Sequence, residues 1–212
     1  SDGSPVTQAD IASSQIIVSL LEPIGFPITG EESVKSDFSI RSKWSNSWCV
    51  DPLDGTREFV KKNGEFAVNI AHLIENKAVF GIIASPVNEE IIFGGSLHGV
   101  FISSFEAIEN SEKWRRVEPN EILVNEIIIA CSRSHPSGKI QNYSETLKAD
   151  FKTVDFLKKG SALKFFDLAK GIANAYPRFA PTMEWDIAAG QAILEALGGE
   201  VISQETNQPL VY

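Results

Sequence analysis

The spacing of apolar residues predicts a helix near the start of the chain and strands after it. Over residues 7–21, apolar side chains recur at the three- and four-residue spacing of one helix face, and Pro23 ends the pattern. Residues 47–50 form a short apolar run that leads into Asp51, which predicts a strand. From residue 66 to residue 101, short apolar runs are separated by glycine, proline and asparagine. This pattern predicts an antiparallel meander.

The second half of the chain alternates between strand and helix patterns. We expect strands over residues 127–131, 153–156 and 173–176, and helices over residues 136–149, 161–170 and 185–197. Alternation of this kind is typical of α/β layers. The change of pattern near residue 118 predicts two lobes: residues 1–118 form an α+β lobe and residues 119–212 an α/β lobe.

Composition and charge narrow the class of protein. Of 212 residues, 43% are hydrophobic and 22% are charged, and no apolar run reaches the roughly 18 residues of a membrane span. The net charge of −9 is unfavourable for binding a nucleic acid polymer, so an anionic small molecule would need a metal ion or a local basic cluster. Cys49 and Cys131 lie far apart in apolar stretches, which favours reduced thiols and a cytoplasmic protein.

Two carboxylates follow the apolar run at residues 47–50. Asp51 and Asp54 can both lie at the carboxyl end of a strand, where their negative charges repel each other. A bound cation relieves that repulsion. Gly55 and Thr56 would then open a helix whose free N–H groups bind an anion beside the cation. The alternative is a helix-capping turn without a ligand.

Further acidic residues strengthen the interpretation as a metal site. Glu31 lies upstream after a Thr-Gly step, and Asp186 lies at the start of the last predicted helix among core-like residues. None of the four candidate ligands is His or Cys, and an all-oxygen set favours Mg²⁺ over Zn²⁺. The residues alone therefore predict magnesium-dependent phosphoryl hydrolysis. The alternative of another class is a non-catalytic metal- or nucleotide-binding protein.

Several short motifs occur in the order of a known family signature. They are Gly30-Glu-Glu-Ser33, Asp51-Pro-Leu-Asp-Gly-Thr56, and Trp185-Asp186 followed by Gly198-Gly199. Over nearly the whole chain the sequence resembles the inositol monophosphatase superfamily of lithium-sensitive, Mg²⁺-dependent phosphatases. The resemblance implies an α/β fold of the layered αβαβα sandwich type.

A second set of motifs resembles one branch of that superfamily, the 3′(2′),5′-bisphosphate nucleotidases of the CysQ type. They are Ser4-Pro-Val-Thr-Gln-Ala-Asp10, Asn63-Gly-Glu-Phe66, Ser132-Arg-Ser-His135, Gly160-Ser-Ala-Leu-Lys164, and Tyr176-Pro-Arg-Phe179 with Pro181-Thr182. Family members carry a further helix before the first of these motifs and a further strand near the C-terminus. We therefore expect this chain to be part of a longer one.

The resemblance implies a role for each matched acidic residue. Glu31, Asp51 and the carbonyl of Leu53 would hold one Mg²⁺, and Asp51, Asp54 and Asp186 a second one, with a third ion left open. Such a pair of ions is the usual two-metal arrangement of phosphatases.

The resemblance also implies a water-activating pair and a nucleotide pocket. Thr56, hydrogen-bonded to Asp10, would orient the attacking water and help to deprotonate it. The positions matched to substrate binding are Gly55, Thr56, Ser132, His135, Gly160, Ser161, Lys164 and Arg178. Without the motifs, Lys164 and Arg178 could be solvated surface charges and His135 a helix cap.

Together these roles imply hydrolysis of the 3′-phosphate of 3′-phosphoadenosine 5′-phosphate to AMP and phosphate, as a step in sulfur metabolism. The first alternative is an inositol monophosphatase or another sugar-phosphate phosphatase on the same metal core. The expected partner is a small bisphosphorylated nucleotide, and the sequence leaves a monomer and a homodimer both open.

Overall fold

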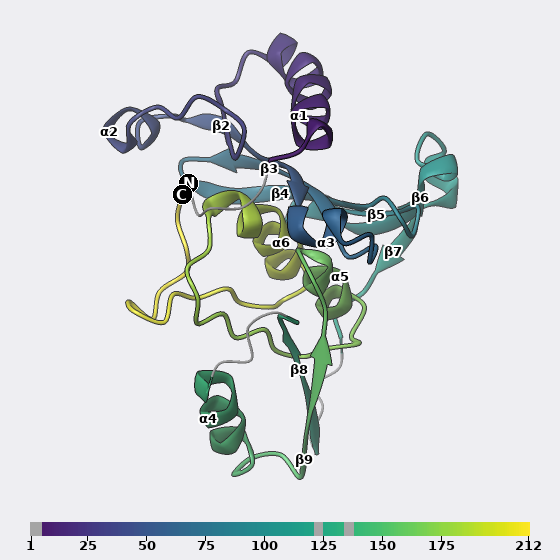
Figure 1. Ribbon diagram of the computed structural model, residues 1–212, viewed down its shortest axis with the longest axis vertical. Helices are drawn as coiled ribbons and strands as arrows, with labels where there is room; N and C mark the ends of the chain where they lie inside the picture. The colour runs from purple at the N-terminus through teal and green to yellow at the C-terminus, as the bar shows by residue number, and fades with distance from the viewer. Residues whose placement is uncertain (1–5, 121–124, 134–137) are drawn as a thin grey trace.

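The computed structural model describes residues 6–120, 125–133 and 138–212, and the described residues form one seven-stranded sheet (Figure 1). Its strands follow chain order: β1 (Ile28–Gly30), β2 (Asn46–Asp54), β3 (Ala67–Ile74), β4 (Lys77–Ser85), β5 (Glu90–Gly95), β6 (Gly99–Ser104) and β7 (Arg115–Val117). β1 pairs with β2 in parallel, and the other neighbouring strands of this sheet pair antiparallel. The predicted meander over residues 66–101 is therefore confirmed.

The second half of the chain forms the strands and helices that its pattern predicts, except the strand expected over residues 173–176. β8 (Glu126–Cys131) and β9 (Thr153–Lys158) form a parallel pair. The α-helices are α1 (Gln8–Leu21), α2 (Phe38–Arg41), α3 (Thr56–Val60), α4 (Gly138–Leu147), α5 (Leu163–Ala169) and α6 (Glu184–Ala196). The short 3₁₀ turns are η1 (Glu22–Ile24), η2 (Phe105–Ala107) and η3 (Ser111–Lys113).

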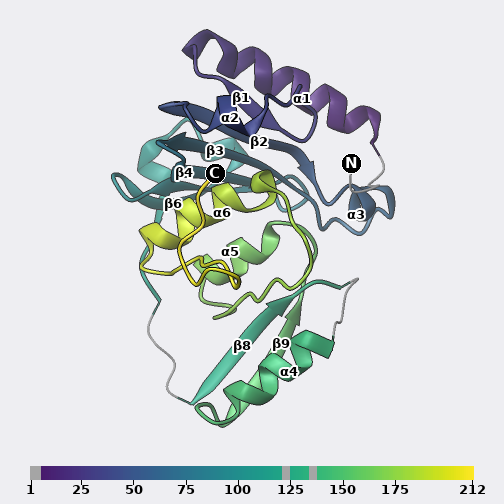
Figure 2. The ribbon, with the colours of Figure 1, turned by 90° about the vertical axis from the view of Figure 1, so that its left-hand side faces the viewer.

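The elements stack as layers. Figure 2 shows them in the order α1, the seven-stranded sheet, α5 with α6, the β8–β9 pair, and α4. This order confirms the predicted α/β fold of the αβαβα sandwich type. The division into residues 1–118 and 119–212 stays a prediction, because the sheet ends at Val117 while α6, from the second half, packs against β2 to β5.

The core lies between the sheet and α6. β3 alternates buried and partly buried positions, and its buried residues Ala67, Ala71 and Leu73 share one core with the small side chains of α6. Gly81 on β4 lets α6 approach closely, because a Cβ there would lie 2.1 Å from the Ala189 carbonyl oxygen. Close approach places the first turn of α6 beside the end of β2.

The strand expected over residues 173–176 is wrong. This segment makes only a single bridge, between Ile129 and Ala175. The Asn174 side chain accepts the Ile128 N–H at 2.8 Å, so a side chain occupies a position that a backbone carbonyl would take in a regular strand. Pro177, which follows soon after, has no N–H to continue a ladder.

α1 begins at a well-formed cap. The Thr7 side chain accepts the Ala9 N–H at 3.1 Å, and the Asp10 carboxylate accepts the Thr7 N–H at 2.7 Å. This capping box confirms the predicted helix start. Asp10 is the buried residue of α1, whereas Ile16 and Leu20, expected on an apolar side, are 62% and 70% exposed. Among the described residues, no helix is both long and apolar enough to cross a membrane.

Candidate active site

At the end of β2, the carboxylates of Asp51 and Asp54 lie on the same face of the strand. In a regular strand, residues three apart point to opposite faces. Between Asp51 and Asp54, however, the pairing with β3 shifts: Asp51 lies opposite Asn69 and Asp54 lies opposite Ala67. One extra residue on β2 restores a common face, and Pro52, which cannot donate to the ladder, lies within the bulge.

α6 brings a third carboxylate to the same corner. Carboxylate oxygens of Asp51, Asp54 and Asp186 all lie within 4.8 Å of one another. Asp186 is held in the first turn of α6, where its Oδ2 accepts the Thr182 hydroxyl at 2.7 Å and the Met183 N–H at 3.1 Å. These three residues were all predicted metal ligands, and the fold brings them together.

The charges in this corner are poorly compensated by the protein. Burial raises the pKa of Asp51 well above its ordinary range, and the negative charges of Asp54, Glu31 and Asp186 raise it further. Burial and the charge of Asp186 raise the pKa of Asp54 to about 6, although Lys164 and hydrogen bonds from the Ala162 N–H and the Asn69 side chain oppose this. A group of carboxylate oxygens with such excess negative charge fits a hard divalent cation.

The other two predicted ligands lie beside this cluster. Glu31 directly follows β1, and its N–H donates to the Val50 carbonyl at 3.3 Å, so it leaves the sheet next to β2. The carbonyl oxygen of Leu53 accepts the Thr56 hydroxyl at 3.2 Å. Their coordination of an ion stays a prediction.

Thr56 and Asp10 form a buried pair. The Thr56 Oγ1 lies 3.2 Å from Asp10 Oδ1, and the two residues are 5% and 1% exposed. Asp10 cannot easily rotate, because its other oxygen accepts both the N–H and the hydroxyl of Thr7. Gly55 places Thr56 at the start of α3 with a left-handed φ of 91°, a conformation that favours glycine. The structure therefore places the predicted water-activating pair in contact.

Two predicted nucleotide residues, Gly160 and Ser161, lie on the segment between β9 and α5. The Gly160 N–H donates to Glu65 Oε2 at 2.8 Å, and the Ala162 N–H donates to Asp54 Oδ2. Ser161, between them, has a φ of 51°, and its Oγ accepts the Leu163 N–H at 3.3 Å. This segment thus contacts the carboxylate corner directly.

Lys164 is not a solvated surface charge. It is 2% exposed, and its ammonium donates to the Ser161 carbonyl at 2.5 Å and to the Lys159 carbonyl at 3.4 Å. The ammonium also lies 5.0 Å from the centre of the Tyr176 ring. Because its charge lowers the pKa of Asp54, Lys164 acts electrostatically on the carboxylate corner.

The remaining predicted substrate residues are more peripheral. Ser132 is partly buried just after β8. Arg178 is in a part-exposed segment, where its Nη1 donates to the Tyr176 hydroxyl at 3.4 Å and its Nη2 donates to the Pro181 carbonyl at 3.2 Å. Tyr176 thus contacts both Arg178 and Lys164. His135 lies outside the described residues.

Sequence reasoning also missed Asn69. Its Oδ1 finds no partner among the described residues although the residue is 1% exposed, and its Nδ2 lies 3.5 Å from Asp54 Oδ2 and 3.4 Å from the Trp185 carbonyl. The available signal was a polar residue at a core-facing position of an alternating strand.

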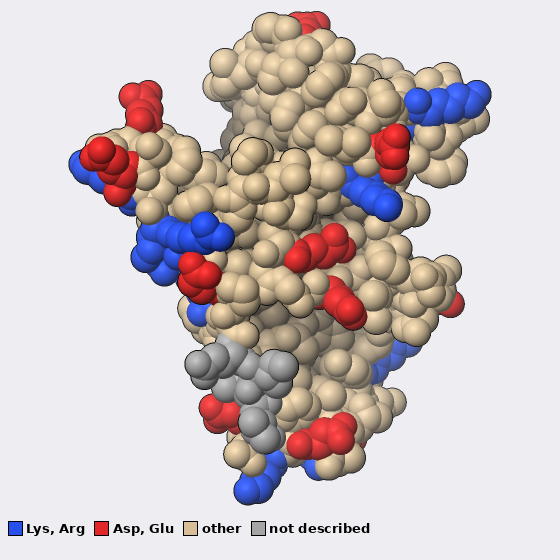
Figure 3. Space-filling model, turned by 180° about the vertical axis from the view of Figure 1, so that it is seen from behind, with Lys and Arg blue, Asp and Glu red and all other residues tan. Residues whose placement is uncertain are grey.

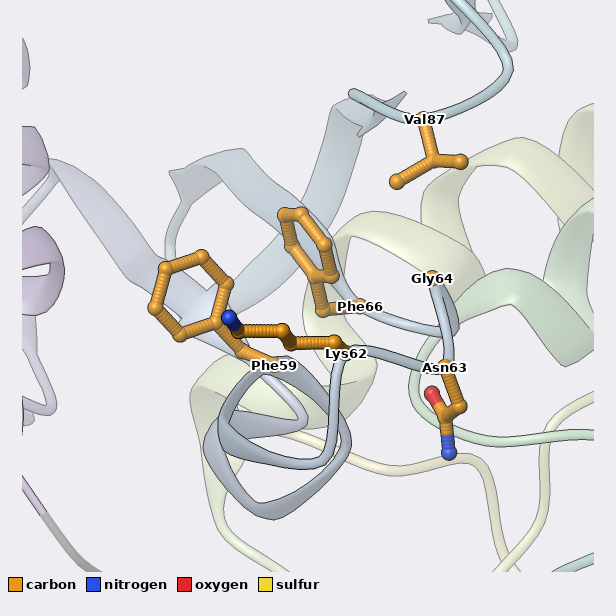
Figure 4. Close-up of a pocket in the computed structure, with 6 residues that line it drawn as sticks. All are labelled: Phe59, Lys62, Asn63, Gly64, Phe66 and Val87. Atoms are coloured by element: carbon orange, nitrogen blue, oxygen red, sulfur yellow. The ribbon is translucent and has the colours of Figure 1, made fainter.

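A surface cavity of about 340 Å³ lies beside α3 (Figure 4). It is lined by Phe59, Lys62, Asn63, Gly64, Phe66 and Val87. Phe59 and Phe66 meet edge to face with ring centres 5.0 Å apart, and the lining includes none of the three carboxylates of the corner. On the face seen in Figure 3, acidic and basic side chains are interspersed, so this face has no broad basic surface for a nucleic acid polymer.

Comparisons with known proteins agree with this geometry. A model of the inositol monophosphatase family matches residues 1–212. The 3′(2′),5′-bisphosphate nucleotidase CysQ of Buchnera aphidicola is 38% identical over 94% of this chain and 71% of its own length. The protein of the same name from Escherichia coli K12 is 35% identical over 100% of this chain and 80% of its own.

A solved structure is similar as well. The crystal structure of CysQ from Bacteroides thetaiotaomicron, described as a bacterial member of the inositol monophosphatase family, superposes with a TM-score of 0.87 at 39% identity. The match covers 100% of this chain and 81% of the solved one.

Proposed function

Because this chain belongs to the inositol monophosphatase family, we propose that it is a Mg²⁺-dependent 3′(2′),5′-bisphosphate nucleotidase that hydrolyses 3′-phosphoadenosine 5′-phosphate to AMP and phosphate. One observation carries the proposal: three carboxylates lie within 4.8 Å of one another, close to a buried hydroxyl–carboxylate pair and to a buried lysine. The names of the relatives at 35% and 38% identity support the substrate class.

The carboxylates of Asp51, Asp54 and Asp186 would hold magnesium, with Glu31 and the Leu53 carbonyl completing the set. All of these donors are oxygen atoms, which suits Mg²⁺. When bound, magnesium lowers the pKa of water and stabilises developing negative charge on phosphate and leaving-group oxygens. Two ions are proposed, and a third stays open.

Thr56 and Asp10 would orient the attacking water and accept its proton. The Thr56 hydroxyl has two acceptors at 3.2 Å, Asp10 Oδ1 and the Leu53 carbonyl, but only one proton to donate. When it donates to Asp10, its lone pairs remain free to accept a hydrogen bond from water. A buried carboxylate fixed by Thr7 keeps this direction constant, which is what a general base pair needs.

Lys164 would recognise the second phosphate of the nucleotide. Its ammonium has three donors, and two of them meet backbone carbonyls. The third donor is available for a phosphate oxygen. Gly55, Ser132, His135, Gly160, Ser161 and Arg178 are proposed as further contacts of the substrate.

The test is phosphate release from 3′-phosphoadenosine 5′-phosphate and from inositol 1-phosphate, each with Mg²⁺ and with EDTA. We expect Mg²⁺-dependent release that favours the nucleotide and that is lost in Asp54→Asn. Lys164→Ala should then lose far more activity on the nucleotide than on the monophosphate. A preference for inositol 1-phosphate would mean that the substrate is a sugar phosphate and not the nucleotide. Phosphate release from neither substrate would favour a non-catalytic binding protein.

Three narrower predictions are kept with this proposal. They are inhibition by lithium, a role in sulfur metabolism and a cytoplasmic location. Inhibition is measured in the same phosphate-release assay by adding lithium chloride, with sodium chloride at equal ionic strength as the control.

A further inference from the structure

Glu65 joins two segments that are far apart in the sequence. It lies in the loop between α3 and β3, and its side chain is 14% exposed. Its Oε2 accepts the Gly160 N–H at 2.8 Å and the Arg133 Nε–H at 2.7 Å, and its Oε1 accepts from Arg133 Nη2 at 2.5 Å. Two parallel bonds from one guanidinium fix the carboxylate in orientation as well as in position.

The charged state of Glu65 agrees with these contacts. Burial alone raises the pKa of this carboxyl, but the hydrogen bonds from Arg133 and from the Gly160 N–H outweigh it, so its pKa lies below the ordinary value. Glu65 is therefore ionised at neutral pH and available to both partners.

The backbone at Gly160 is pressed against Glu65. A Cβ at Gly160 would lie 2.9 Å from the Glu65 carbonyl oxygen and 3.0 Å from Glu65 Cβ, so only glycine fits there without a shift. Two residues later the Ala162 N–H donates to Asp54. The turn over residues 160–162 is thus anchored at one end by Glu65 and at the other by a carboxylate of the proposed metal corner.

Both partners of Glu65 follow parallel strands. Arg133 comes two residues after the end of β8, and Gly160 comes two residues after the end of β9. Ligands of α/β proteins bind at the carboxyl ends of parallel strands. Glu65 therefore ties these two strand ends to each other and to the loop that follows α3.

We propose that Glu65 is a positioning residue that holds the carboxyl ends of β8 and β9 against the carboxylate corner and thereby sets the affinity for the nucleotide part of the substrate. The inference rests on the proposed function. Because Glu65 is placed to act through Gly160 and Arg133 and not on the reacting atoms, its loss should raise KM and leave kcat nearly unchanged.

Three variants separate the two contacts of Glu65. Glu65→Ala removes both of them, Glu65→Gln keeps an oxygen for the Gly160 N–H but loses the charge that pairs with the guanidinium, and Arg133→Ala removes the guanidinium alone. Glu90→Ala is the matched control, because it removes another ion pair, with Lys170 at 2.6 Å, that also joins the sheet to the second half of the chain.

The experiment measures kcat and KM of the full-length protein for 3′-phosphoadenosine 5′-phosphate and for p-nitrophenyl phosphate, which has no nucleotide. For Glu65→Ala we expect the nucleotide KM to rise roughly tenfold or more, the range for losing a charge-assisted hydrogen bond. Glu65→Gln and Arg133→Ala should show smaller increases. The values for p-nitrophenyl phosphate, and all values for Glu90→Ala, should stay within about twofold of wild type.

The outcomes separate the two proposals. A wild-type protein that does not hydrolyse the nucleotide overturns the proposed function. Two results with an active wild type would overturn the positioning role alone. In the first, Glu65→Ala loses activity equally on the nucleotide and on p-nitrophenyl phosphate. In the second, Glu90→Ala raises the KM for the nucleotide as much as Glu65→Ala does. Should Glu65→Ala fail to fold, Glu65→Gln and Arg133→Ala decide the question by the same comparison.

Discussion

The raised pKa of Asp54 makes the electrostatic cost of the carboxylate corner measurable as protein stability. Burial and the neighbouring charge of Asp186 raise this pKa from an ordinary 3.8 to about 6. Between these two values the folded protein binds more protons than the unfolded chain does. In metal-free solution, this group therefore makes the free energy of unfolding fall as pH rises from about 4 to about 6.

The size of the effect follows from the shift. One proton contributes at most about 1.4 kcal/mol per pH unit, so a shift from 3.8 to about 6 corresponds to about 3 kcal/mol of lost stability at neutral pH. A divalent cation bound at the corner would remove this penalty, because it stabilises the ionised carboxylates. The stabilisation by Mg²⁺ should consequently grow as pH rises through the same window.

The assay is urea unfolding of wild type and Asp54→Asn at several pH values from about 4 to about 7, with EDTA and with excess Mg²⁺. Asp54→Asn serves as the reference because its amide does not titrate. The other titratable groups change charge with pH in the variant much as they do in wild type. Asp51 is coupled to Asp54, so the difference between the two proteins reports the pair. The reasoning is refuted if, in EDTA, the wild type does not lose stability relative to the variant as pH rises.

Three other changes test separate parts of the structure. Thr56→Ala should lower kcat about a hundredfold with an unchanged circular dichroism spectrum, because the variant lacks the hydroxyl that would orient water. Thr56→Ser keeps a hydroxyl and should retain most activity. Equal losses of kcat in both variants would contradict this role. Gly81→Ala should lower the free energy of unfolding in urea by about 3 kcal/mol or prevent folding, since its Cβ would lie 2.1 Å from the Ala189 carbonyl oxygen. A loss below about 1 kcal/mol would mean that α6 shifts freely. Asn69→Ala should raise the Mg²⁺ concentration for half-maximal activity several-fold, because it loses the contact at 3.5 Å with Asp54; an unchanged Mg²⁺ curve would assign Asn69 to packing alone.

Local pattern predicted most elements of this fold. Short apolar runs separated by turn residues marked the meander, and apolar residues at helical spacing before Pro23 marked α1, because both signals depend on neighbours within a few residues. The strand expected over residues 173–176 failed because the Asn174 side chain takes the Ile128 N–H, a contact between residues 46 apart. The sequence left open whether Lys164 is a solvated surface charge, since a lysine in a short motif carries no local sign of its surroundings, and the structure shows that it is buried.

By itself, the sequence determined the order of the elements and the chemical types at the corner. Acidic residues without His or Cys, placed after a strand and at a helix start, already indicated a hard cation. The resemblance to the family already implied that Asp186 lies with Asp51 and Asp54, and the tertiary structure shows how the fold brings them together. Only the tertiary structure showed that Glu65 joins the ends of two strands. These contacts depend on the bulge in β2 and on the close packing of α6 against the sheet. Residues far apart in the chain create both features together.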